Sequence, residues 1–111
     1  RTLTRVVPIS NRDGISTSLG STEYMVFNSW QGGNGFSNIY LPVIANSEGR
    51  TIQFHSDDTI SANTYIRLLP NASDTGVNID GATGYYFNRA YDGITILGHA
   101  GQWYIIQKKE K

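Results

Sequence analysis

The sequence predicts an all-β domain, and three observations support this prediction. Short segments rich in β-branched and aromatic residues alternate apolar and polar positions. Turn-forming residues separate these segments at intervals of roughly 8–12 residues. Charged residues make up 16% of the chain, against roughly 25% in an average globular domain, and Gly, Ser, Thr and Asn take their place. We expect a single domain over residues 1–111, an antiparallel, jelly-roll-like β-sandwich of about eight to ten short strands.

The first half of the chain yields three expected strands, at residues 1–9, 23–30 and 39–45. Pro8 and Pro42 each restrict their strand to a sheet edge or a bulge, because proline cannot donate to a ladder. Turn chemistry dominates residues 10–22 and 31–38, where Asp13-Gly14 and Asn34-Gly35 stand. A helix over Ser16–Phe27 is the alternative, but Gly20 and the β-forming segment 24–27 disfavour it.

The second half yields strands at residues 51–56 and 64–70, then short strands within 77–84 and 85–93. Two alternating apolar runs, Ile94–Leu97 and Trp103–Ile106, close the chain around a Gly-containing turn. This spacing predicts a terminal hairpin. Chain ends usually fray, so an ordered hairpin so near the last residue points to a role in packing.

Composition excludes several classes of function. The formal net charge is zero, so no basic field favours nucleic acid. There is no cysteine, and no apolar run approaches the roughly 18 residues of a membrane span. We expect neither nucleic-acid binding nor membrane insertion.

Motifs of catalysis and metal binding are absent from the sequence. His55 and His99 have no second ligand at a metal-binding spacing, although a histidine on a symmetry axis, shared by several copies, stays an alternative. The clustered carboxylates precede or occupy turns, where aspartate accepts backbone hydrogen bonds. They are Asp57, Asp58, Asp80 and Asp92, and a glycan hydrolase would have to use a pair of them. We therefore expect no enzyme activity, no cofactor and no metal.

Aromatic residues are more informative. Tyrosine and tryptophan present a flat apolar face and a polar tip, which suits both interfaces and sugar stacking. On alternating strands, half of the side chains point outward. Some aromatic rings are thus expected on the surface, while others fill the core.

Three segments carry a resemblance to a known family: GRTIQFHSDDTISANTYIRLLP, NIDGATGYYFNRAYDGITILG and GQWYIIQKK. In this order they resemble the C-terminal tip (head) domains of trimeric bacteriophage-type tail fibres, over residues 38–111. The resemblance implies a homotrimer that binds a bacterial surface glycan or outer-membrane component non-covalently. It places the domain at the tip of a virion tail fibre, or on the extracellular surface of a phage-derived fibre. Residues 1–5 would then be the end of an upstream shaft, and the terminal hairpin would lie where three chains meet.

Loop placement selects the expected ligand-binding residues, because loops at the end of a rigid sandwich usually carry recognition. They are Trp30, Gln31, Asn34, Phe36, Tyr91 and His99. Two alternatives stay open. One is a trimerisation or folding module of the fibre without a ligand, and the other is a monomeric carbohydrate-binding module with a planar aromatic platform.

Overall fold

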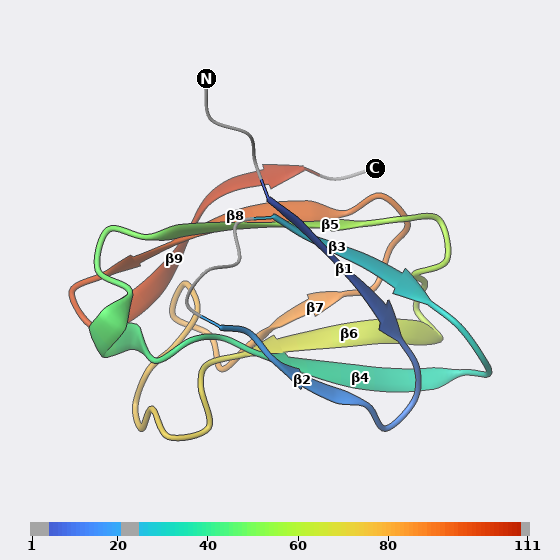
Figure 1. Cartoon of the computed structure of the whole chain (residues 1–111), viewed down its shortest axis with the longest axis horizontal. Coiled ribbons are helices and arrows are strands. Elements are labelled where there is room, and N and C mark those ends of the chain that lie inside the picture. The colour runs from blue at the N-terminus through green and yellow to red at the C-terminus, as the bar shows by residue number, and fades with distance from the viewer. Residues whose placement is uncertain (1–4, 21–24, 110–111) are drawn as a thin grey trace.

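The computed structural model describes residues 5–20 and 25–109, and it confirms the all-β class. Within these ranges nine strands form two sheets, accompanied by one 3-10 turn, η1 (Ile44–Asn46). The five-stranded sheet contains, in spatial order, β1 (Val6–Asn11), β3 (Met25–Trp30), β5 (Thr51–Ser56), β8 (Gly93–His99) and β9 (Gln102–Lys109). The four-stranded sheet contains β2 (Ser16–Ser18), β4 (Gly35–Tyr40), β6 (Thr64–Leu69) and β7 (Tyr85–Phe87). Figure 1 shows the two sheets packed face to face.

The first six strands wind as three coils. Each coil gives one strand to the five-stranded sheet and the next to the four-stranded sheet, so strands of successive coils lie parallel: β1 to β3 to β5, and β2 to β4 to β6. Parallel neighbours need a crossover of a dozen or more residues, and the strand in the opposite sheet supplies it here. β7, β8 and β9 then pair antiparallel and close the domain.

The expected antiparallel, jelly-roll-like topology is therefore wrong. Four of the seven strand pairings are parallel. The short connections after β1, β3 and β5 do not fold back as hairpins but carry the chain across to the other sheet (Figure 1). Gly35, at φ 150°, is needed at one of these crossings, because a Cβ there would collide with the Asp13 carboxylate.

The strands agree with the predicted segments more closely in the second half of the chain than in the first, although the short strand expected within residues 77–84 is wrong. The strands at 51–56 and 64–69 and the terminal hairpin are confirmed, and Pro8 does lie on an edge strand, β1. Residues 16–18 form β2 where a turn was expected, and β4 begins at Gly35 and ends at Tyr40 instead of covering 39–45. Residues 77–84 contain only isolated bridges at Ile79.

No helix in the described ranges has the length and apolarity to cross a membrane.

The apolar core fills the space between the two sheets. Inward side chains of both sheets are fully buried, with Val26, Ile52 and Ile96 facing Ile39, Ile66 and Leu68 from the other layer. Trp103 is also fully buried, which fixes the last hairpin in the core. Trp30 belongs to the same core and its indole Nε1 donates to the Gly33 carbonyl at 2.9 Å.

A polar network lies within this core. Asn11, Asn28, Ser37 and Ser56 are all fully buried. Asn11 Nδ2 donates to Asn28 Oδ1 at 3.2 Å and to the Ser29 carbonyl at 3.0 Å, and its Oδ1 accepts from Ser37 Oγ at 2.9 Å. Asn11 thus joins the two sheets at one end of the sandwich, because Ser37 lies on β4 while Asn28 and Ser29 lie on β3.

The connections gather at two opposite ends of the sandwich (Figure 1). The first loop end contains residues 12–15, 31–34, 57–63 and 88–92. The second loop end contains residues 41–50, 70–84 and 100–101. Backbone hydrogen bonds tie loops of each end to neighbouring strands, such as Gly14 N to Phe36 O of β4 at 3.0 Å and Gly49 N to Gly98 O of β8 at 2.7 Å.

Replacing Asn11 by alanine is expected to destabilise the domain by about 1–3 kcal/mol, because Ser37 and Asn28 lose a buried partner. Chemical denaturation followed by tryptophan fluorescence measures this change. Asn34→Ala, at an exposed loop position, serves as the control and is expected to stay within about 0.5 kcal/mol of the parent. Equal stabilities of the two variants would contradict a structural role for the network.

Candidate functional site

The six residues expected to bind a ligand do not form one site. Gln31 and Asn34 are exposed in the first loop end, and Tyr91 lies in another loop of that end, where its N–H donates to the Asp57 carbonyl. His99 is the last residue of β8 and borders the second loop end, at the opposite end of the sandwich. Trp30 is only 7% exposed, so its ring has no free face for stacking. Phe36 lies on β4, within a sheet instead of a loop.

Phe36 belongs to a row of aromatic rings on the outer face of the four-stranded sheet. We call Phe36, Tyr65 and Tyr86 the aromatic row. Phe36 on β4 stacks on Tyr65 of β6 with ring centroids 5.5 Å apart, and Tyr65 stacks on Tyr86 of β7 at 5.6 Å. Tyr86 is 49% exposed, and the other two rings are half-buried.

The strand register builds this row. Phe36 and Tyr65 are direct partners in the parallel pairing of β4 with β6, and the side chains of both point away from the core because their neighbours Ser37 and Ile66 are buried. Tyr86 joins from the antiparallel strand β7, next to buried Phe87. The three rings come from three separate parts of the chain, and they meet only because these strands share one sheet.

A polar pair flanks the aromatic row. Arg67 Nε donates to Asn38 Oδ1 at 2.8 Å, and the Arg67 guanidinium carbon lies 4.4 Å from the centroid of the Phe36 ring. Asn38, Arg67 and Tyr86 are neighbours across β4, β6 and β7. Within the described part of the chain, the terminal N–H groups of Arg67 make no hydrogen bond. The face therefore combines flat apolar surface with free hydrogen-bond donors.

Such a face suits a ligand with an apolar side and polar groups at its rim. Aromatic rings offer large contact area with little loss of conformational entropy. Arginine adds planar donors that match hydroxyl, carboxylate or phosphate oxygens. A cyclic sugar has this character, since its ring hydrogens form an apolar face and its hydroxyl groups project outward.

The four carboxylates considered for hydrolysis lie in or beside turns. Asp57 Oδ1 accepts from the Thr59 N–H at 2.9 Å, and Asp80 lies in a turn with φ 53°. Asp92 is 3% exposed, with its Oδ2 accepting from the Tyr85 hydroxyl at 3.1 Å. In the described ranges no group of three or more His, Asp or Glu residues is arranged to hold a metal ion.

Comparison with known proteins adds no relative: no family model, no curated protein and no solved structure matches the chain. The aromatic row is therefore the strongest candidate site on geometry alone.

Of the six expected residues, the aromatic row contains Phe36. Sequence reasoning missed Tyr65, Tyr86 and Arg67 as members of a site, although the alternation of GFSNIY and TYIRLL, 29 residues apart in the register, carries the signal.

His99 pairs with Glu48 across the second loop end. Its Nδ1 lies 2.6 Å from Glu48 Oε2, and Glu48 Oε1 accepts from the Ala100 N–H at 2.9 Å. The hydrogen bond from Ala100, followed by that from His99, lowers the pKa of Glu48 below the ordinary value for a glutamate. Both side chains are more than 60% exposed, so the contact links two loops at the surface.

Folding lowers the pKa of Glu48, so its ionised form stabilises the fold at pH values above the ordinary glutamate pKa. This contribution is lost as the pH falls through the lowered folded-state pKa. An NMR titration of the Glu48 side chain is expected to show a midpoint in the folded protein below that of the same side chain in the unfolded protein. In His99→Ala, which removes the imidazole partner of Glu48, the midpoint should rise toward the ordinary value. A midpoint at the ordinary value in the parent protein would contradict the bond from Ala100.

Proposed function

We propose that the domain is the receptor-binding tip of a trimeric phage-type tail fibre and that it recognises a bacterial surface glycan non-covalently. The observation that carries the glycan part is the aromatic row with Arg67 and Asn38 on the outer face of the four-stranded sheet. The fibre part rests on the sequence resemblance over residues 38–111.

The geometry of the row favours an extended ligand. Three rings in series cross three strands, so successive sugar units of one chain can each contact a ring or the flanking polar pair. The most exposed ring, Tyr86, stands at the edge strand of the sheet. A ligand is therefore expected to approach from the β7 side and to lie along the row toward Phe36.

Stacked aromatic pairs also stabilise sheets by themselves, by roughly 0.2–1 kcal/mol per cross-strand pair. If the domain were a trimerisation module without a ligand, stabilising the sheet would be the whole role of the aromatic row. The exposed part of the Tyr86 ring and the terminal N–H groups of Arg67 favour the binding function instead, because they leave apolar surface and donors available to a ligand.

A monomeric carbohydrate-binding module is the second candidate, and the same row supports it. The two candidates agree on the ligand class and differ in assembly. The last strand favours the trimer, since β9 is an edge strand on which Tyr104 and Ile106 are 39% and 54% exposed while Trp103 is fully buried. Three chains in one rigid tip would also raise the avidity of weak single sites.

Replacing Tyr65 or Tyr86 by alanine is expected to weaken binding to the cognate glycan by about tenfold, or roughly 1.4 kcal/mol. A glycan array identifies the ligand, and titration calorimetry then measures the affinity of each variant. Tyr91→Ala is the control, because it removes a tyrosine of the first loop end that is 41% exposed, close to the 49% of Tyr86. Loss of binding in Tyr91→Ala, together with full binding in both row variants, would contradict the aromatic row and indicate a binding site in the loops of the first loop end.

The mass of the domain in solution decides between the two assemblies. Light scattering behind a sizing column is expected to give three times the 12.3 kDa chain mass. Ile106→Asp should lower this mass, because a carboxylate in an apolar chain contact carries a large desolvation cost. A monomer at all concentrations would favour the carbohydrate-binding module.

A further inference from the structure

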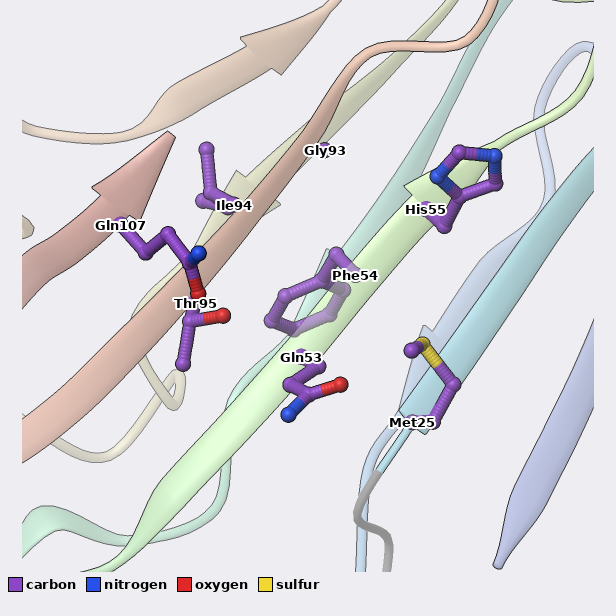
Figure 2. Close-up of a pocket in the computed structure, with 8 residues that line it drawn as sticks. All are labelled: Met25, Gln53, Phe54, His55, Gly93, Ile94, Thr95 and Gln107. Atoms are coloured by element: carbon purple, nitrogen blue, oxygen red, sulfur yellow. The ribbon is translucent and has the colours of Figure 1, made fainter. Parts of the chain in front are cut away.

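A depression lies on the outer face of the five-stranded sheet, opposite the face that carries the aromatic row. It has a volume of about 170 Å³ and is bordered by Met25, Gln53, His55, Gly93, Thr95 and Gln107. Figure 2 shows Gln53 and His55 on β5, with Met25 on one side and Thr95 and Gln107 on the other. None of these residues belongs to the aromatic row or to the loop ends.

The missing side chain of Gly93 helps to form the depression. In the register Gly93 is the partner of His55, and the adjacent row across the sheet consists of Met25, Gln53, Thr95 and Gln107. A Cβ on Gly93 would lie 2.8 Å from the Phe54 carbonyl oxygen and 3.5 Å from His55 Nδ1. The close approach of the two strands thus requires glycine here, and it leaves the space beside the imidazole open.

The polar side chains around the depression have free hydrogen-bonding capacity. Gln53, Thr95, Gln107 and His55 make no side-chain hydrogen bond within the described part of the chain. Two amides, a hydroxyl and an imidazole supply both donors and acceptors. Among the residues that the structure describes, no carboxylate, lysine or arginine borders the space, so these residues offer a charged ligand no fixed counter-charge.

From this arrangement we infer a second binding site, for one neutral sugar ring. The depression has the volume of about six water molecules at about 30 Å³ each, which is the scale of a single pyranose. The amide and hydroxyl groups match ring hydroxyls, and Met25 offers an apolar wall. The inference shares the carbohydrate class of ligand with the proposed function, but it rests on different residues on the opposite face.

The test is a titration of ¹⁵N-labelled full chain, followed by amide chemical shifts. The probes are methyl glucopyranoside, methyl galactopyranoside and N-acetylglucosamine, each to concentrations on the order of 50 mM, because a small open site is expected to bind with millimolar affinity. Glucuronate is the charged counterpart. The variants are Gln53→Ala with Gln107→Ala, and Tyr86→Ala as the matched change on the other face.

We expect at least one neutral probe to shift the amides of residues 53–55 and 93–95 in the parent and in Tyr86→Ala, with the shifts reduced at least fivefold in the double variant. Unchanged spectra elsewhere in the double variant show that it is folded. Absence of shifts with every neutral probe, equal shifts in the double variant, or a response to glucuronate alone would each overturn the inference. Loss of glycan binding in Tyr86→Ala with retained shifts at residues 53–55 separates this site from the aromatic row.

Discussion

The in-register parallel stacking of three coils is the constraint on which the rest of the structure depends. Met25 and Gln53 are partners in one sheet, and Gly35 and Thr64 are partners in the other. Each coil therefore places its inward side chains directly above those of the next. The same stacking aligns the outward side chains. Aromatic residues at equivalent outward positions of two coils therefore lie side by side and form a continuous surface. The same strand register therefore determines both the packing of the core and the arrangement of the candidate site.

The closing strands make this arrangement a finite domain. A stack of parallel coils would leave an exposed ladder at its end, and such edges promote association. β8 covers β5, and β7 covers β6, both with reversed direction. β9 then moves the edge one strand outward, and buried Trp103 holds it to the core. Antiparallel strands thus end a parallel stack, and each sheet has strands of both orientations.

The sequence identified which segments are strands in the second half of the chain, because β-branched and aromatic alternation is strong in TIQFHS and TYIRLL. It did not identify how they pair. A connection of four residues after β1 or β3 looks like a hairpin turn, yet it crosses to the other sheet. Local turn chemistry is the same in both cases, and the pairing that distinguishes them is seen only in the structure. For the same reason Phe36 was assigned to a loop, and its partners Tyr65 and Tyr86 were not recognised, because proximity across strands depends on the pairing.

The separation of the two faces of each strand has a consequence for how this domain can diversify. Buried Ile39, Ile66 and Leu68 set the spacing of the coils, while Phe36, Tyr65 and Arg67 alternate with them and face solvent. Loss of one cross-strand pair on the outer face costs roughly 0.2–1 kcal/mol, which is less than the roughly 2–5 kcal/mol lost when a buried Ile or Leu is cut back to alanine. The outward positions can therefore be exchanged one at a time, and each exchange alters the recognition surface while the scaffold beneath it persists. Because the three rings belong to different strands, insertions in the intervening loops also leave their alignment intact.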